Sequence, residues 1–305
     1  MENSLNFSTH AALGFAFQSD PFQAGREAAQ MAKSQLTQEN PSLVLAVGPC
    51  KGLFQDFLEG VRLVTGEETL VGIPVDRMVS NDLFAPETCV VLMLASQTSK
   101  FSLAYAPFHK SHMEPVTTRL ISQLRNARRD IRSQYDCHGV VLIQNKAQHD
   151  GKLPNQIISQ MGLDSWLLSF SCQQKESTPL ICQDQMLSEG VVAIECFSQV
   201  PWGLSIVETE PFKDNPSIVQ EAVKIGLRDA HKKMGEQTPV MGFILFNCPV
   251  KSLSDSDFGN IFKMSQLFLK DIPFLGMMIE NPFLQVDARM NFNTKESILV
   301  MLIPH

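Results

Sequence analysis

Three passages of the chain share one order of predicted elements, and this repetition limits the possible folds more than any other feature. Each passage contains an apolar strand, a loop with Pro-Phe and then a helix: HAALGFAFQSDPFQAGREAAQMAK, FSLAYAPFHKSHMEPVTTRLISQL and LSIVETEPFKDNPSIVQEAVKIGL. A second apolar run follows each passage, as PSLVLAVG, HGVVLIQN and PVMGFILFN. These runs start near residues 42, 139 and 240, so the period is about 100 residues.

The complete repeating unit is predicted to be strand–helix–strand–helix–strand–strand. Short continuous apolar runs such as Leu43–Val47 and Leu70–Ile73 are typical of strands covered on both faces. Every α/β protein alternates strands and helices, so chance likeness is the alternative, but the shared Pro-Phe loop and the equal spacing favour real repetition. A period of this length is typical of duplicated lobes rather than of a solenoid. We therefore predict an α/β protein of mixed sheets flanked by helices, built from three pseudo-repeats.

The units are expected to pack tightly, because no Gly/Ser-rich linker separates them. We predict a boundary near Glu208–Ser217, in a polar segment before a predicted helix. It divides the chain into residues 1–208, with two pseudo-repeats, and residues 209–305, with the third.

Composition excludes several classes of protein. The chain of 305 residues is 44% hydrophobic and 19% charged, which is enough apolar surface for a sizeable core. Its net charge of -7 argues against broad nucleic-acid binding. The seven cysteines include no CxxC pair, which indicates free thiols in a reducing compartment. No signal peptide or membrane span is apparent, so we expect a cytoplasmic protein without membrane insertion.

Several segments, in order, resemble the FIST family of intracellular sensory proteins. The N-terminal likeness is carried by AGREAAQMAK, PSLVLAVGP, a helix with LEGVR, and TLVGIP. The C-terminal likeness is carried by GFILFNC, DIPFLGMMIEN and MNFNTKESILVMLIP. The chain departs from the family at Ile279, where the family has Gly before its Glu, and at LLSFSC, where the family often has Gly-Gly. If those glycines let a backbone approach a ligand, the pocket of this chain is changed.

The resemblance implies an α/β fold with FIST-like N-terminal and C-terminal regions, an intracellular location and the sensing of a small ligand, with amino acids proposed. Ligands of α/β proteins tend to bind beyond the carboxyl ends of parallel strands. The candidate ligand-binding residues in such loops are Gly48, Cys50, Asp76, Asn247, Cys248, Glu280, Asn281, Asn293 and Thr294. Each has a plain structural alternative: the cysteines as packing residues, the carboxylates as exposed loop residues, and Asn293-Thr294 as a turn cap.

We expect a cytoplasmic ligand-sensing module of a signal-transduction system that reports to a downstream signalling protein. No catalytic residue, cofactor or metal site is predicted, because the chain contains no Walker A, GxGxxG, HExxH or GxSxG motif. His109 and His112 have His-x-x-His spacing but lie in a predicted loop without a third ligand. Two alternatives stay open: an enzyme that uses the thiol of Cys50 or Cys248, and a degenerate family member that serves as a protein-interaction scaffold.

Overall fold

The structure is a computed structural model. It describes residues 9–17, 19–36, 40–48, 54–75, 78–80, 89–108, 114–128, 135–145, 152–161, 165–172, 178–209, 216–247, 255–286, 291–293 and 296–305.

Three units of the same element order follow one another along the chain. The first contains β1 (Thr9–Ala16), α1 (Pro21–Gln35), β2 (Leu43–Gly48), α2 (Phe54–Thr65), β3 (Leu70–Pro74) and β5 (Cys89–Ser96). The second contains β6 (Ser99–Pro107), α3 (Glu114–Arg128), β7 (Cys137–Gln144), α4 (Lys152–Met161), β8 (Trp166–Cys172) and β11 (Gly190–Ser198). The third contains β12 (Gly203–Glu208), α5 (Pro216–Met234), β13 (Pro239–Asn247), α6 (Asp255–Leu269), β14 (Phe274–Gln285) and β16 (Ser297–Pro304).

The strands of the three units are arranged in the same spatial order. The orders are β1-β5-β2-β3, β6-β11-β7-β8 and β12-β16-β13-β14. In each unit the last strand lies antiparallel between the first and second strands, and the second and third strands are parallel. The predicted α/β class with mixed sheets is therefore confirmed. The agreement between units is one of topology, and descent from a duplicated sequence stays a prediction.

Four short strands connect the units, and only the strand at Leu180–Cys182 was predicted from the sequence pattern. They are β4 (Met78–Ser80), β9 (Leu180–Cys182), β10 (Gln185–Leu187) and β15 (Asn291–Asn293). Of these, β9 comes from the second unit but pairs with β3 of the first, whereas β4 comes from the first unit and pairs with β14 of the third. The result is a six-stranded sheet and a ten-stranded sheet that exchange strands. Because β12 pairs with β16, the strand that precedes the predicted boundary belongs to the sheet of the C-terminal segment.

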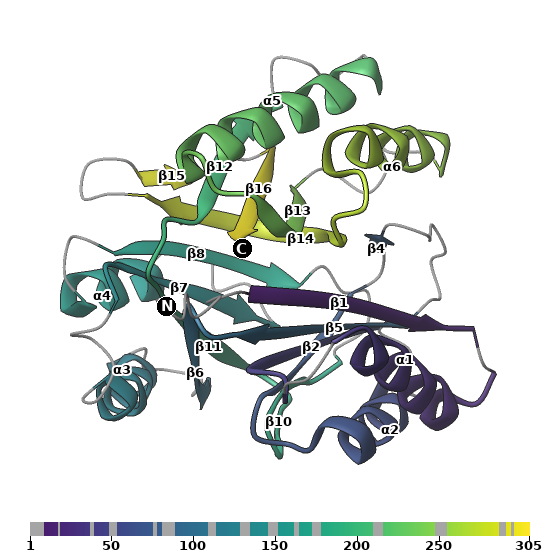
Figure 1. Ribbon diagram of the computed structural model, residues 1–305. Helices are drawn as coiled ribbons and strands as arrows, with labels where there is room; N and C mark the ends of the chain where they lie inside the picture. The colour runs from purple at the N-terminus through teal and green to yellow at the C-terminus, as the bar shows by residue number, and fades with distance from the viewer. Residues whose placement is uncertain are drawn as a thin grey trace, which may run out of the picture.

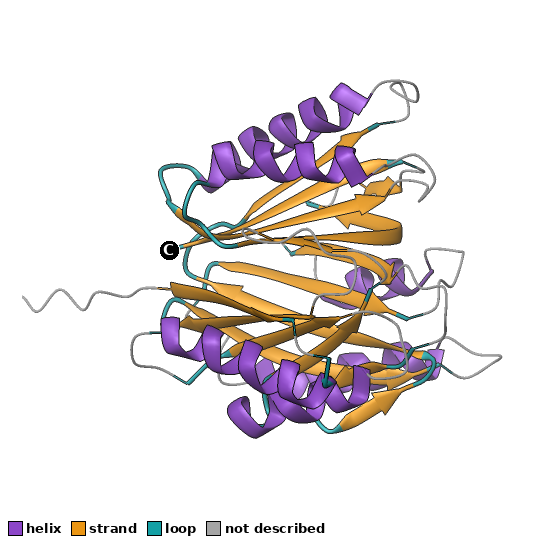
Figure 2. Ribbon diagram, turned by 90° about the vertical axis from the view of Figure 1, so that its right-hand side faces the viewer, coloured by secondary structure: helices purple, strands orange, loops and turns teal. Residues whose placement is uncertain are grey.

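The two sheets face each other and the helices lie outside them (Figures 1 and 2). The inner faces meet in one apolar core with side chains from both sheets, including Leu45, Ile143, Phe243 and Met277. Three further apolar clusters lie between the sheets and the helix pairs α1/α2, α3/α4 and α5/α6. Strands of both sheets are thus covered on two faces, which explains why so many of them are continuous apolar runs.

Helices α1 and α2 approach each other at two glycines. A Cβ atom on Gly25 would lie 1.9 Å from the carbonyl oxygen of Phe57, and one on Gly60 would lie 2.0 Å from that of Phe22. Helix α1 begins at the predicted Asp20-Pro21 cap, where the Asp20 carboxylate accepts a hydrogen bond from the backbone N–H of Gln23 at 3.2 Å. The glycines of the AGREAAQMAK and LEGVR segments therefore serve helix packing in this fold.

Candidate functional sites at the strand ends and on the second unit

The carboxyl ends of strands from the second and third units meet at the middle of β14. Strand β13 runs parallel to the first half of β14 and its last parallel pair is Phe246 with Met278. Strand β8 runs antiparallel to the second half, with Ile279 opposite Cys172 and Glu280 opposite Ser171. The ends of two parallel strand pairs therefore point toward each other across Glu280, which is exposed. This is the kind of place where α/β proteins bind ligands.

A β-bulge lies directly after Glu280. The register between β14 and β8 shifts between Glu280 and Phe283, so the two residues Asn281 and Pro282 stand against the single residue Phe170 of β8. Asn281 adopts a φ of 49°, in the left-handed region that asparagine tolerates better than most residues, and Pro282 has no N–H to donate to a ladder. Bulges of this kind often re-aim side chains near functional sites.

Buried polar side chains line β7 and β8 beside this bulge. Gln144 and Glu280 both lie directly opposite Ser171, so the three side chains share the helix-facing side of the sheet. The Gln144 amide nitrogen donates to the Ser169 hydroxyl at 3.1 Å. Its amide oxygen is buried and has no hydrogen-bond partner among the described residues. Ser169 and Ser171 belong to the LLSFSC segment, in which the family often has glycines.

The opposite face of the same sheet edge is also polar. Asn247 ends β13 and lies opposite Ser297, which in turn lies opposite Glu208. The hydroxyls of Ser297 and of the adjacent Thr209 are buried without a partner in the described part of the chain. Nearly all such atoms in folded proteins are paired. Both residues are separated from Gln144 on β7 by at least three intervening strands, so they do not belong to the region around Gln144 and Glu280.

The other predicted site residues divide into two groups. Gly48 ends β2 in the six-stranded sheet, and a Cβ atom there would lie 3.1 Å from the Phe54 ring, so packing accounts for this glycine. Asn293 ends β15 opposite Phe283. Outside the described residues lie Cys50, Asp76, Cys248 and Thr294, together with His109 and His112. The structure thus brings Asn247, Glu280 and Asn281 to one region and does not test the thiol hypothesis.

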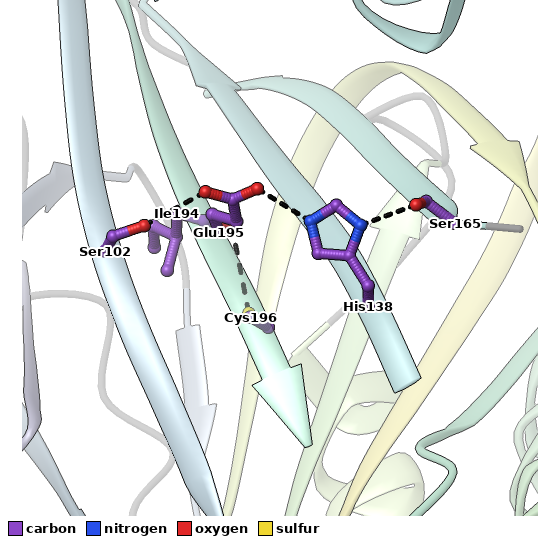
Figure 3. Close-up of polar contacts among 6 residues, drawn as sticks. All are labelled: Ser102, His138, Ser165, Ile194, Glu195 and Cys196. Atoms are coloured by element: carbon purple, nitrogen blue, oxygen red, sulfur yellow. Dashed lines mark hydrogen bonds and ion pairs between the residues drawn. The ribbon is translucent and has the colours of Figure 1, made fainter. Parts of the chain in front are cut away.

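The sequence analysis did not identify a hydrogen-bonded cluster on the second unit (Figure 3). Glu195 on β11 is fully buried, and its carboxylate accepts a hydrogen bond from Ser102 at 3.1 Å. Its other oxygen lies 2.6 Å from His138 Nε2, and His138 Nδ1 lies 2.5 Å from the Ser165 hydroxyl. The four side chains form one row across β6, β11, β7 and the residue before β8.

One feature of the sequence pointed to this cluster. Glu195 interrupts the apolar run VVAIECF, and a carboxylate in a buried strand needs a charged or hydrogen-bonding partner. The partner was not recognisable, because His138 lies 57 residues away and the contact depends on strand order. The His138 ring also stacks on Phe197 with 4.9 Å between ring centroids, which fixes its orientation.

Two of the described cysteines, Cys182 and Cys196, are poorly suited to nucleophilic chemistry. Burial, followed by the charge of Asp184, raises the pKa of the Cys182 thiol to about 12. Burial, with a smaller effect of Glu195, raises the pKa of Cys196 well above its usual value. A thiol attacks as its thiolate, so these two groups are unreactive at neutral pH.

The core between the sheets leaves little room for a ligand. A cavity of about 40 Å³ lies among apolar side chains of both sheets, including Leu45, Phe243 and Trp202. This volume is close to that of one water molecule, and its lining contains no polar surface to hold one. Ligand binding therefore has to be sought at the edges of the sheets.

No helix in the described part of the chain is both long and apolar enough for a membrane span. The same residues contain no cluster of three or more metal-ligating side chains.

Comparison with known proteins adds no family assignment: no protein-family model matches the chain, and no curated protein matches it. The resemblance to the FIST family stays a prediction that rests on the segments quoted above.

Proposed function

We propose that the protein binds a small ligand at the middle of β14, where the carboxyl ends of β7, β8 and β13 meet. The observation that carries this proposal is the buried amide oxygen of Gln144, which has no hydrogen-bond partner among the described residues and lies two strands from Glu280 at these strand ends. Burying such an atom without a partner costs about 1–3 kcal/mol. A ligand that supplies the missing hydrogen bond would recover part of that cost.

The side chains at this edge favour a ligand with an ammonium group, such as an amino acid. Glu280 provides an exposed carboxylate beside the bulge, and Gln144 provides a buried amide oxygen on the same face. Strands lie about 4.8 Å apart, so the backbones at these two residues, two strands apart, are separated by roughly 10 Å. That span accommodates a small metabolite. A role in cytoplasmic signal transduction, with a downstream protein as partner, is implied by the FIST resemblance alone.

A thermal-shift screen over amino acids and simple amines tests this proposal. A ligand at 100 times its Kd stabilises the folded state by about 2.7 kcal/mol, which corresponds to a rise in Tm of about 5 °C. We expect Glu280→Gln to abolish the shift, while Glu236→Gln, an exposed carboxylate after α5, leaves it unchanged. The proposal fails if no compound stabilises the protein or if the two variants respond alike.

A second candidate function rests on the Ser165–His138–Glu195 row. When Glu195 accepts the Nε2 proton, Nδ1 is free to accept the proton of the Ser165 hydroxyl, as a general base does in ester hydrolysis. The Ser165 oxygen would bond to the carbonyl carbon, and the proton on Nδ1 would pass to the leaving alcohol. Water would then hydrolyse the acyl–serine ester and restore the hydroxyl.

Labelling with a fluorophosphonate tests this second function. Reaction at Ser165 that is lost in Ser165→Ala and His138→Gln, but kept in Ser102→Ala, supports it. Ser102 is the matched control because it contacts the same carboxylate but not the imidazole. If the wild-type protein remains unlabelled, the row is a structural network that satisfies the buried Glu195.

A further inference from the structure

A groove lies near the amino-terminal ends of β13 and β14, between the C-terminal ends of α5 and α6. The region around Glu280 lies at the carboxyl end of β13. The volume of the groove is about 560 Å³, within the range of about 300–1,000 Å³ that is usual for small-molecule sites. It is far larger than the cavity between the sheets, and it shares no lining residue with the region around Glu280. It is therefore a separate feature of the third unit.

The base of the groove is apolar. Leu227 of α5, Leu269 of α6 and Leu302 of β16 line it, and each is at least 97% buried in the fold. Phe268 forms part of the wall and is 39% exposed. An apolar group seated here would cover the Phe268 ring and gain the free energy of removing that surface from water.

The rim of the groove carries the cationic side chains of Arg228 and Lys270 and the imidazole of His231. Arg228 and His231 lie one turn apart on α5, so they project from the same side of the helix. Lys270 follows α6 in a left-handed conformation with a φ of 50°, and Asp271 is the one carboxylate in the lining. The groove is thus a basic site on a chain whose net charge is -7.

These cations are not used by the fold. Within the described ranges, neither Arg228 nor Lys270 makes a side-chain hydrogen bond or an ion pair, and the same holds for His231. Other lysines of α5 differ, because Lys224 pairs with Glu221 and Lys233 donates to the Leu204 carbonyl. Cations near helix C-termini are favoured by the helix dipole. The dipole explains why positively charged side chains occur at these helix ends. It does not explain why side chains from two helices surround one groove with an apolar base.

We propose that this groove binds a small organic anion with an apolar body, such as an aromatic or aliphatic carboxylate. The acidic group pairs with Arg228 and Lys270 at the rim, and the apolar body lies on Leu269 and Phe268. A site that combines an apolar lining with a few convergent polar groups is the usual design of small-molecule pockets.

The matched probes 1-anilinonaphthalene-8-sulfonate and N-phenyl-1-naphthylamine test the proposal, because they share one aromatic body and only the first is an anion. We expect fluorescence titration to show saturable binding of the sulfonate and at least tenfold weaker binding of the neutral amine. Arg228→Gln and Lys270→Gln should each weaken sulfonate binding by about fivefold, since a partly exposed ion pair is worth about 1 kcal/mol.

Lys232→Gln is the control, because this exposed residue adjoins His231 on α5 but does not line the groove. Circular dichroism and Tm measurements confirm that each variant is folded. Equal affinity in Lys270→Gln and Lys232→Gln overturns the proposal, as does equal binding of the two probes. A concentration-dependent dimer that is dispersed by Lys270→Glu, without probe binding, also overturns it. Glu280→Gln should leave this binding unchanged, so failure here is distinguishable from failure of the β14 site.

Discussion

The first and second units share a strand order but differ in the sheet surface beneath their helices. In the first unit that surface is apolar, with Val44, Ala46, Val91 and Met93 packed against α1 and α2. In the second unit the same surface includes the polar row of Ser102, Glu195, His138 and Ser165.

The difference indicates that the topology does not require an apolar helix-facing surface throughout. Replacing both partners of a buried hydrogen-bonded pair by apolar groups of similar shape is often nearly neutral or stabilising. The polar row is therefore not needed to stabilise this strand order, which the first unit reaches with apolar side chains, and a functional role accounts for it better. The two units can be tested separately, because the two surfaces belong to different sheets and are covered by different helices.

The largest effect is expected for Gly60→Ala in the first unit. A Cβ atom there would overlap the Phe22 carbonyl oxygen, and separating α1 from α2 should cost about 4 kcal/mol of unfolding free energy. Urea denaturation measures it. Gly259→Ala on α6 is the control, since a Cβ atom there meets nothing within 4 Å and alanine favours a helix. Equal stability of the two variants would show that α1 and α2 are not held at the close distance described.

A smaller loss is expected for His138→Ala in the second unit. The variant leaves the buried Glu195 carboxylate with only part of its hydrogen bonding, which should cost about 3 kcal/mol. The double variant His138→Leu/Glu195→Leu should recover most of this loss, because it gives the second unit an apolar surface like that of the first. A double variant as unstable as His138→Ala would mean that the polar row is needed for folding.

Alkaline pH should destabilise the protein through Cys182, whose strand β9 pairs with the first unit. The folded-state pKa of about 12 lies above the unfolded value of 9.0, so the unfolded chain releases its proton first. Stability is therefore lost as pH rises from 9 toward 12, by about 2 kcal/mol at pH 10.5. Cys182→Ala should lose less stability over this range in denaturation at several pH values. Identical pH slopes would exclude this thiol as the cause.

The smallest effect concerns the cap of α1. Asp20→Ala removes the acceptor for the Gln23 N–H and should cost about 1 kcal/mol, whereas Asp20→Asn should retain most of the stability. A difference in Tm between the two variants measures the cap. If alanine and asparagine behave alike, the helix is held by its packing on α2 and the sheet rather than by its first turn.

Sequence patterns predicted the six helices and the long strands of the described chain, because their apolar runs and caps are local signals. Strands β4, β10 and β15 have three residues each, too few for a period to be recognised, and their existence depends on partners elsewhere in the chain. The assignment of strands to two sheets could not be predicted either, because β9 belongs to the second unit in sequence but pairs with β3 of the first.

The candidate site was predictable in position but not in composition. Asn247 and Glu280 were identified from strand ends, and the structure places them at the middle of β14. Ser169 and Ser171 were missed because each lies within β8, where a polar residue does not stand out from the strand. Gln144 was missed because it is the last residue of β7, just before the loop that was considered. The role of Ile279, where the family has Gly, could be recognised only in the structure. Its side chain is 1% exposed and packs in the core between the sheets.

Strand β14 has a consequence for the order in which the protein folds during synthesis. It pairs with β13, β8, β4 and β15, and it alone joins the two halves of the ten-stranded sheet. It is synthesised late, so the edges of β8 and β4 that pair with it stay unpaired until a partner about 100 to 200 residues downstream has been made. Contacts over such separations slow folding. The nascent chain is therefore most exposed to edge-to-edge aggregation until residues 274–285 emerge.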